Sequence, residues 1–240
     1  MTEKTIRLLQ LYPRDMNIYG DWGNTLTLKR RLEWHGYQVE LLEHNPGDQF
    51  PPDVDLIVGG GGQDSGQDVI QADLLKQGPK LLALAKSGVP MLMICGMYQL
   101  FGKFFRTREG HTINGIGLFD IETYGGSERM IGNIVTKSNL FGDIIGYENH
   151  SGRTMLGKAA QPFGTVYRGA GNNGKDATEG AVCHNVIGTY LHGSLLPKNP
   201  AVADWLIEKA TTRKFGEFTA TVVDDRFASE ARRIAASRPR

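Results

Sequence analysis

The residue in this chain best placed for nucleophilic chemistry is a cysteine at the end of an apolar run. Residues 90–101 read Pro-Met-Leu-Met-Ile-Cys-Gly-Met-Tyr-Gln-Leu-Phe, so Cys95 lies between a strand-like segment and a glycine. The pattern predicts a strand over 91–94 that is buried on both faces, followed by a helix that carries the aromatic residues up to Phe105. At a helix start the dipole and the unpaired N–H groups favour an anion, here the thiolate. The alternative interpretation is a buried core cysteine.

A second strand-like run, Ile187-Gly-Thr-Tyr-Leu-His-Gly-Ser194, ends in a candidate base, His192. An imidazole within hydrogen-bond reach can take the proton from Cys95 and later return it to a leaving group. Both residues end predicted strands, and the active groups of open α/β sheets gather at the carboxyl ends of strands. A lone histidine is more often structural, but the two residues together favour a catalytic pair.

The order of strand-like and helix-like patterns around this pair predicts an open, mainly parallel α/β sheet flanked by helices, with an antiparallel extension. The expected elements are strands over 6–11, 38–42 and 54–58, helices over 25–34 and 68–87, antiparallel strands within 110–190, and a last long helix from Asn199 to near Thr211. We expect one domain over 1–212. The extension over 213–240 is expected to be a partly mobile tail or the end of a solvated helix.

A run of glycines, Gly59–Gly62, follows the third predicted strand and offers backbone donors for a reaction at the cysteine. Because glycine has no side chain, its N–H group can approach a ligand closely. The N–H of Gly96 and an amide from Gly60 or Gly61 would form an oxyanion hole for attack on a carboxamide. The alternative is a turn with no chemical role.

Several motifs of the chain resemble those of one enzyme family. They are Cys-Gly-Met-Tyr-Gln-Leu-Phe-Gly (95–102), Gly-Thr-Tyr-Leu-His-Gly (188–193), Tyr-Gly-Asp-Trp-Gly-Asn-Thr (19–25), Gly-Gly-Gly-Gly-Gln-Asp (59–64) and Tyr-Glu-Asn-His-Ser-Gly-Arg-Thr (147–154). The first two are similar to signatures of class I glutamine amidotransferases of the cobyric acid synthase type, whose fold is flavodoxin-like. The other three resemble the GatD family, the glutaminase subunits of lipid II isoglutaminyl synthase.

This resemblance implies an enzyme that hydrolyses L-glutamine to glutamate and ammonia through Cys95 and His192. It also implies a heterodimer with a Mur-ligase-like synthetase subunit, MurT, which would use the ammonia to amidate the D-glutamate of the lipid II stem peptide to D-isoglutamine. ATP and Mg²⁺ are expected on that partner, and no cofactor is expected in this chain. The alternatives are a glutaminase of another amidation system, such as cobyrinic acid amidation, a peptidase of related fold, or a non-catalytic binding module.

Glutamine also has an α-carboxylate that the protein must bind. Arg129, in the glycine-rich stretch 125–133, is our candidate, because a guanidinium fork matches a carboxylate bidentately. The alternative for Arg129 is a solvated surface residue. Gln99 matches the glutamine that follows the family's cysteine by four and is expected either to contact the substrate or to serve in capping or packing.

The chain departs from the wider class at three positions around the predicted pair. Met93 and Met97 stand where glycine is usual two residues before and after the cysteine, and their side chains are expected to narrow the glutamine pocket. Ser194 stands where the class commonly has a glutamate that orients the histidine. A hydroxyl cannot supply that charge, so we expect a carboxylate from the partner to complete the triad and the isolated chain to be weakly active.

Composition excludes several other functions. The 27 basic and 26 acidic residues nearly cancel, so there is no electrostatic case for nucleic-acid binding. With two cysteines the chain lacks a disulfide framework, and Cys183 is expected to pack in the core. No apolar run is long enough to span a membrane and no signal-peptide core is present, so we expect a cytoplasmic protein without an integral membrane segment.

Two further site classes are rejected on sequence. Four histidines, His44, His111, His150 and His184, are scattered without the spacing of metal ligands, so no metal site is expected. The stretch 169–176 resembles a phosphate-binding loop until Asp176, which stands where a Ser or Thr hydroxyl is needed. We therefore expect a hairpin or loop there.

Overall fold

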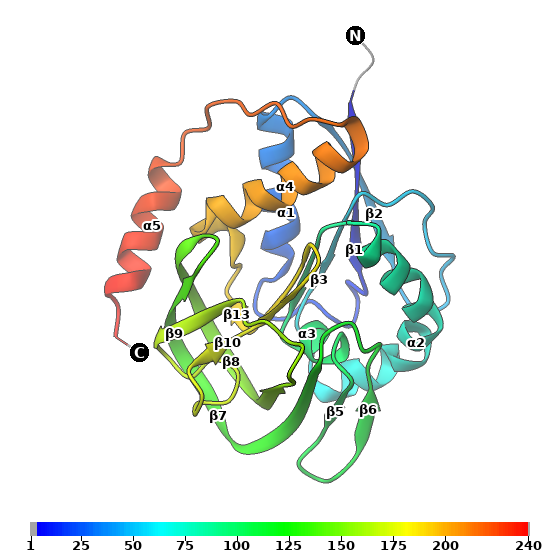
Figure 1. Cartoon of the computed structure of the whole chain (residues 1–240), viewed down its shortest axis with the longest axis vertical. Coiled ribbons are helices and arrows are strands. Elements are labelled where there is room, and N and C mark those ends of the chain that lie inside the picture. The colour runs from blue at the N-terminus through cyan, green and yellow to red at the C-terminus, as the bar shows by residue number, and fades with distance from the viewer. Residues whose placement is uncertain (1–3, 240) are drawn as a thin grey trace.

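A six-stranded sheet forms the centre of the structure (Figure 1). The structure is a computed structural model and describes residues 4–239. Across the sheet the strands run in the order β11 (Ala181–Cys183), β12 (Val186–Thr189), β4 (Met91–Ile94), β3 (Leu56–Gly59), β1 (Thr5–Leu11) and β2 (Gln38–His44). β11 pairs antiparallel with β12, and the other neighbours pair parallel. The predicted fold class is confirmed.

Helices cover both faces of this sheet (Figure 1). They are α1 (Trp22–Trp34), α2 (Asp64–Lys86), α3 (Gly96–Leu100) and α4 (Pro200–Phe215), with the short 3-10 helix η1 (Leu196–Lys198) before α4. α1 packs against α4, whereas α2 packs against α3. Every residue of β3 and β4 is buried, as expected for parallel strands covered on both sides.

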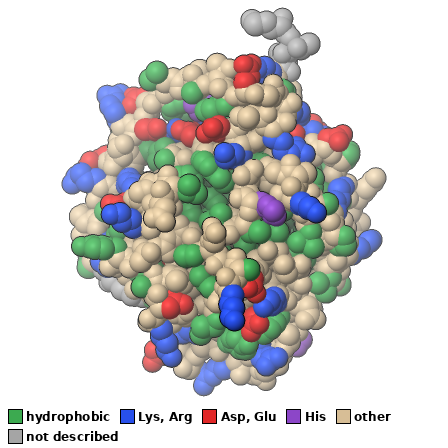
Figure 2. All heavy atoms as spheres, viewed as in Figure 1, with side chains coloured by type: hydrophobic (Ala, Val, Ile, Leu, Met, Phe, Trp, Pro, Cys, Tyr) green, Lys and Arg blue, Asp and Glu red, His purple; other side chains and the backbone are tan. Residues whose placement is uncertain are grey.

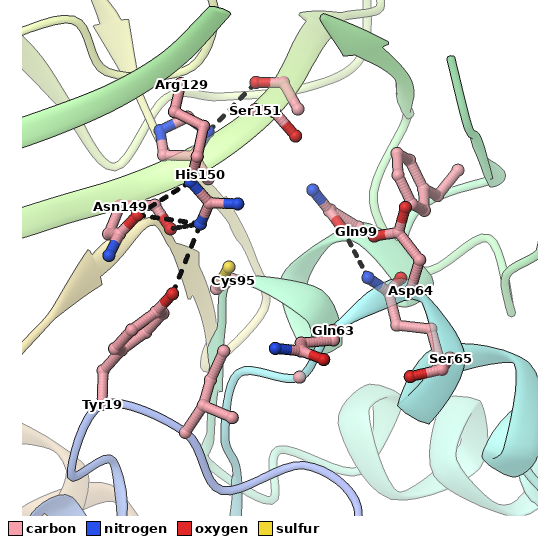
Figure 3. Close-up of a pocket in the computed structure, with 15 residues that line it drawn as sticks. Tyr19, Gln63, Asp64, Ser65, Cys95, Gln99, Arg129, Asn149, His150 and Ser151 are labelled. Carbon is pink, nitrogen blue, oxygen red and sulfur yellow. Dashed lines mark hydrogen bonds between the residues drawn. The ribbon is translucent and has the colours of Figure 1, made fainter. Parts of the chain in front are cut away.

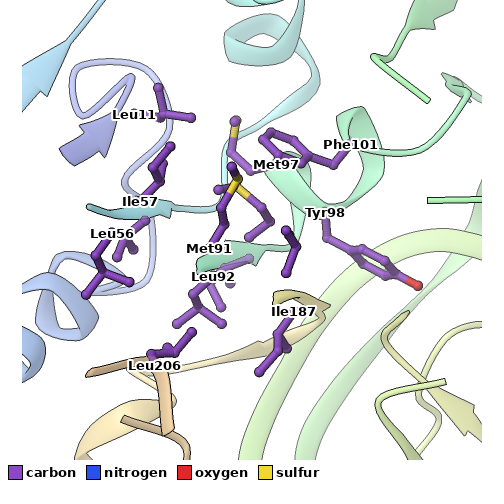
Figure 4. Close-up of a cluster of buried hydrophobic side chains, with 14 of the residues drawn as sticks. Leu11, Leu56, Ile57, Met91, Leu92, Met97, Tyr98, Phe101, Ile187 and Leu206 are labelled. Carbon is purple, nitrogen blue, oxygen red and sulfur yellow. The ribbon is translucent and has the colours of Figure 1, made fainter. Parts of the chain in front are cut away.

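The hydrophobic core fills the two layers between the sheet and the helices. Figure 4 shows Met97 of α3 and Phe101, which follows that helix, on one side of the central strands and Leu206 of α4 on the other. All three side chains are fully buried. A core built from both faces fixes the carboxyl ends of the strands, where the candidate site lies.

A second, seven-stranded sheet forms the predicted extension; its neighbouring strands pair antiparallel except β5 and β7, which pair parallel. Its strands are β5 (Phe104–Arg106), β6 (Thr112–Asn114), β7 (Ile121–Ser138), β8 (Gly142–Leu156), β9 (Gly164–Arg168), β10 (Thr178–Glu179) and β13 (Leu191–His192). β7 and β8 form a long antiparallel hairpin whose register shifts between Gly125 and Met130. The rejected phosphate-loop segment lies between β9 and β10, which pair antiparallel as a hairpin.

The helix after Cys95 is shorter than the sequence predicts. α3 ends at Leu100, and Phe104 and Phe105 belong to strand β5 instead. The chain turns at Gly102, where a Cβ would lie 2.4 Å from a side-chain carbon of Ile121. Only glycine fits this approach, and beyond it the second sheet supplies backbone partners that a helix would leave unused.

The strand that leads to His192 is also divided. β12 ends at Thr189 in the central sheet, and β13 pairs with β8 in the second sheet. The sequence predicts that His192 ends a parallel strand. In the structure it lies instead where the chain crosses between the two sheets. A hydrogen bond from Leu191 N–H to the Thr189 hydroxyl, 3.1 Å long, spans the break.

The C-terminal segment forms a solvated helix, α5 (Arg226–Ser237), in which no residue is buried. In Figure 1 it lies beside the second sheet, and it also contacts η1. Asp225, just before it, pairs with the buried Arg31 at 2.6 Å, and Arg232 donates to Asn199 at 2.9 Å. Among the described residues, no helix combines the length and apolar character needed to cross a membrane. On the face shown in Figure 2, basic and acidic side chains are interspersed.

Candidate active site

Cys95 lies on a strained turn between β4 and α3. Its backbone has φ 50° and ψ −104°, a conformation that a non-glycine residue adopts only where its surroundings enforce it. A 2.8 Å hydrogen bond from its N–H to the Thr189 carbonyl holds the turn against β12. The residue is 6% exposed and lines a cavity. This geometry is a nucleophile elbow, as the sequence pattern predicts.

His192 is brought beside Cys95 by the register of two strands. Thr189 of β12 pairs with Ile94 of β4, so the segment after β12 passes the cysteine. A Cβ on Gly61 would lie 2.6 Å from Cε1 of His192 and 3.3 Å from Cβ of Cys95. Both side chains thus meet the same glycine, and any larger residue there would displace the imidazole.

Asp21 binds the other side of the imidazole. Its carboxylate oxygens lie 3.2 and 3.1 Å from Nδ1 of His192, and neither residue is exposed. The Gly61 N–H donates to the same carboxylate at 2.7 Å. Asp21 occupies the N-cap position of α1 but its side chain does not cap the helix. Cys95, His192 and Asp21 therefore have the arrangement of a nucleophile, a base and an orienting acid.

The electrostatics of the imidazole agree with this arrangement. Burial lowers the pKa of His192, but the charge of the Cys95 thiolate and the hydrogen bond to Asp21 outweigh burial and raise it to about 10. Nε2 has no hydrogen-bond partner among the described residues. The imidazolium is thus held by charge beside Cys95, with Nε2 free for a reacting group.

The structure corrects the expectation that His192 lacks a carboxylate within this chain. Ser194, which stands where a glutamate is common, donates from Oγ to the Gly20 carbonyl at 2.5 Å. It therefore fastens the loop that carries the next residue, Asp21. Sequence reasoning missed Asp21, although its position after the first predicted strand places it at the same sheet edge as the cysteine.

A cavity of about 360 Å³ opens beside Cys95 (Figure 3). Arg129 of β7 lines it, and its Nε and Nη2 donate to Asn149 Oδ1 at 3.1 and 2.8 Å. Nη2 also donates to the hydroxyl of Tyr19 at 3.3 Å. The structure therefore brings Arg129 into the same cavity as the cysteine; the residue is exposed, and two neighbours hold its guanidinium fork.

Gln99 also lines this cavity, but its amide group is bound within the chain. Gln67 Nε2 donates to Gln99 Oε1, and Gln99 Nε2 donates to the Tyr190 hydroxyl, both at 3.0 Å. The side chain is 4% exposed. These contacts favour the packing role among the alternatives that the sequence leaves open.

His150, which the sequence leaves without a role, is a wall of the cavity. It stacks on Tyr190 with ring centroids 3.6 Å apart, and Nδ1 lies 3.0 Å from the Gly152 carbonyl. Burial lowers the pKa of His150 to about 3, so the ring is neutral. Because a carbonyl can only accept, Nδ1 carries the proton. Its signal in the sequence was the family-like motif 147–154.

The glycines predicted for the oxyanion hole occupy different positions. Gly96 follows Cys95 at the start of α3, and Gly61 directs its N–H to Asp21 instead of the cavity. A Cβ on Gly60 would lie 2.4 Å from the Met16 carbonyl. Gly62 lines the cavity, and its nitrogen is 3.1 Å from where a Cβ on Gly96 would be.

Met93 and Met97 do not narrow the cavity, contrary to expectation. Both are fully buried, and a Cβ on Gly59 would lie 2.9 Å from atoms of each. Their side chains fill the space that Gly59 leaves in the core. Within the described residues, no group of three or more His, Cys, Asp or Glu side chains is arranged to hold a metal ion.

Comparison with known proteins connects this site to one family. Residues 7–200 match the CobB/CobQ-like glutamine amidotransferase domain. The chain is 37% identical to the GatD subunit of lipid II isoglutaminyl synthase (glutamine-hydrolyzing) from Staphylococcus aureus, over 93% of this chain and 91% of that protein. Identity to the Streptococcus pneumoniae GatD subunit is 34%, over 88% and 83% of the two chains. A Brucella abortus cobyric acid synthase matches over only 65% of this chain and 32% of its own length.

Solved structures agree on the fold. A chain of PurLQS from Thermotoga maritima superposes with a TM-score of 0.59 at 16% identity, covering 84% of this chain and 97% of that one. A glutamine amidotransferase from the same organism superposes with a TM-score of 0.56 at 14% identity, over 96% and 93% of the two chains. At these identities the likeness concerns the fold alone.

Proposed function

The chain belongs to the CobB/CobQ-like glutamine amidotransferases and within them to the GatD group, and we propose that it hydrolyses L-glutamine to supply ammonia to a lipid II isoglutaminyl synthase. The observation that carries this proposal is the triad of Cys95, His192 and Asp21 beside a cavity that also contains Arg129. The triad supplies acyl transfer chemistry, and the guanidinium supplies a partner for the α-carboxylate of a free amino acid.

In the first half of the reaction, the Cys95 thiolate attacks the carboxamide carbon of glutamine. The carbonyl electrons move to oxygen, and we assign the N–H groups of Gly96 and Gly62 as donors to this oxyanion. Gly62 replaces Gly60 and Gly61 of the sequence-based prediction, because the Gly61 N–H serves Asp21. The His192 imidazolium gives its proton to the departing nitrogen, the C–N bond breaks, and ammonia leaves a thioester on Cys95.

In the second half, neutral His192 takes a proton from water, and the resulting hydroxide attacks the thioester. The C–S bond breaks, the carboxylic acid product leaves and loses its proton to solvent to give glutamate, and the thiolate and imidazolium return. Asp21 keeps Nδ1 protonated and the ring in place throughout, so that Nε2 always faces the reacting atoms. Each residue therefore ends the cycle in the state in which it began.

The ammonia is a substrate for amide formation on a second subunit. We propose a Mur-ligase-like partner of the MurT type that forms a heterodimer with this chain and binds ATP and Mg²⁺. That partner would activate the D-glutamate carboxylate of the lipid II stem peptide, which ammonia converts to D-isoglutamine. We place the protein in the cytoplasm, where Cys95 stays a free thiol.

The test is a glutaminase assay on matched cysteine variants. Cys95→Ala should abolish ammonia release from L-glutamine, whereas Cys183→Ala should retain it, because Cys183 lies away from the cavity and burial raises the pKa of its thiol. Acid quenching of the wild-type protein during turnover of labelled glutamine should trap a thioester on Cys95. Full turnover by Cys95→Ala would show that Cys95 is not the nucleophile. A wild type that is inactive both with and without its partner would favour the alternative of a non-catalytic binding module of the same fold.

A further inference from the structure

The wall of the cavity that faces Arg129 is the first turn of α2. This helix begins at Asp64, earlier than the sequence predicts, and Asp64 and Gln67 both line the cavity. Residues three apart on a helix share one face, so the two side chains project together. Figure 3 shows Asp64 on the opposite side of the cavity from Arg129.

Both side chains on this wall offer acceptor oxygens; Asp64 is an exposed residue, whereas Gln67 is buried. Asp64 accepts from its own backbone N–H and forms no ion pair with any described residue. Gln67 is 2% exposed; its Nε2 donates to Gln99, but its Oε1 is buried with no hydrogen-bond partner in the described structure. A buried acceptor without a donor is costly, so Gln67 Oε1 is well suited to accept from a donor group of a ligand.

Opposite charges lie on opposite walls of the cavity. Arg129 is the cation on one wall, and Asp64 is the carboxylate on the other. Burial and the charge of Glu109 raise the pKa of Asp64, whereas the charge of Arg129 lowers it. A cation beside Asp64 would stabilise its carboxylate against both burial and the charge of Glu109.

We propose that Asp64, assisted by Gln67 Oε1, binds the α-ammonium group of the substrate and makes the site specific for a free L-α-amino acid amide. This inference rests on the proposed glutaminase function. An ammonium group has three donors and no acceptor, and the wall offers a carboxylate and an amide oxygen. With Arg129 on the carboxylate, the cavity matches a zwitterion and rejects glutamine whose amino group is absent or acylated.

Asp64 could instead serve only the helix, because acidic residues stabilise the positive end of a helix dipole. That role predicts a change in stability without any change in substrate preference. Asp68 lies one turn later on the same helix, is exposed, and pairs with His111 at 2.9 Å. Asp68→Asn therefore removes a similar charge from the helix start without touching the cavity.

The experiment compares L-glutamine with glutaric acid monoamide, which is glutamine without its α-amino group. The full chain carries Asp64→Asn, Asp64→Glu or Asp68→Asn, and KM and kcat are measured for both substrates. We expect Asp64→Asn to raise KM for glutamine about 10- to 100-fold, the range for a lost charged hydrogen bond, with little change in kcat. KM for the monoamide should not change, so the preference for glutamine should collapse.

Asp64→Glu should restore part of the preference, and Asp68→Asn should behave as wild type. If Asp64→Asn retains the wild-type preference for glutamine over the monoamide, the inference is wrong while the glutaminase function stands. If the wild type hydrolyses neither compound, alone or with its partner subunit, both the proposed function and this inference are wrong.

Discussion

At the residue scale, the site depends on how one imidazole is oriented. The carboxylate of Asp21 reaches Nδ1 of His192 at 3.1 Å, and the same carboxylate accepts the N–H of Gly61 at 2.7 Å. These two bonds fix both the position of the acid and the tautomer of the base. The acid therefore comes from a loop after β1, whereas Ser194, which follows the histidine, only fastens that loop.

Asp21→Asn should lower kcat/KM for glutamine by on the order of 10²-fold, because an amide supports the ring but neither charge-stabilises the imidazolium nor enforces the tautomer. Steady-state ammonia release measures this effect, and thermal unfolding verifies that the variant folds. Asp68→Asn is the matched control. An unchanged kcat/KM, with or without the partner subunit, would show that the orienting acid lies elsewhere and would restore the hypothesis of a partner carboxylate.

Arg129→Lys should raise KM for glutamine by roughly 10-fold while kcat changes little. Lysine keeps the charge but loses the fork that Asn149 and Tyr19 hold toward the cavity. The exposed Arg108 provides the control Arg108→Lys. Equal KM values for the two variants would mean that Arg129 does not bind the α-carboxylate.

At the scale of elements, the site is assembled by short segments that follow strands β1, β4 and β12 of the central sheet. The loop before α1 carries Asp21, β13 carries His192, and the turn before α3 carries Cys95. Each segment is attached to another one, since Ser194 donates to Gly20 and the Cys95 N–H donates to Thr189. The geometry of the triad is thus a property of these attachments more than of any one element.

Ser194→Ala should loosen the Asp21 loop and lower kcat for glutamine by about 5-fold, the equivalent of one ordinary hydrogen bond. The contact it removes is the 2.5 Å bond to the Gly20 carbonyl. Ser87→Ala removes the same kind of bond at the end of α2, where Ser87 Oγ donates to Leu84 at 2.9 Å. The Ser87 variant should keep full activity, and matching losses in the two variants would argue against a specific role for Ser194.

At the scale of the whole molecule, buried ionisable groups connect the second sheet to the strand that leads to the site. Glu179 of β10 is fully buried, accepts from the Thr189 hydroxyl at 2.6 Å and from the Tyr190 N–H at 2.9 Å, and thus ties β10 to the crossover before β13. Burial raises the pKa of Glu179 from 4.5 to about 7, against the hydrogen bonds that lower it.

This pKa shift predicts how stability depends on pH. Below pH 4.5 Glu179 is protonated in both the folded and the unfolded protein, so its full contribution to stability is present. Between pH 4.5 and about 7 the unfolded chain loses this proton while the folded protein keeps it, so stability falls as pH rises. Denaturant unfolding should show that Glu179→Gln removes a pH-dependent component on the order of 3 kcal/mol between about pH 4.5 and 7.5.

The comparison must be between the two proteins at each pH, because other groups titrate in the same range. His150 acts in the opposite direction: its lowered pKa makes the fold lose stability as pH falls from 6.5 toward about 3. If the difference in unfolding free energy between wild type and Glu179→Gln is the same at every pH, Glu179 is not protonated at neutral pH in the folded protein.

Local patterns determined much of the fold. The apolar runs 6–11 and 91–94 became β1 and β4, and the helix expected over 25–34 became α1 with His35 and Gly36 at its end. The placement of Cys95 between a buried strand and a glycine specified its elbow. These features follow from hydrophobic periodicity and from glycine at fixed offsets, which act over a few residues.

Tertiary structure alone decided which acid meets His192 and which residues face Arg129. Asp21 and His192 lie far apart in the chain and meet because β1 and β12 belong to one sheet and the chain then crosses to β8. The acceptors of α2 gained their place in the cavity because that helix begins at Asp64. Sequence periodicity carries no information on such contacts, since strand order and register are set by packing between segments that are remote in sequence.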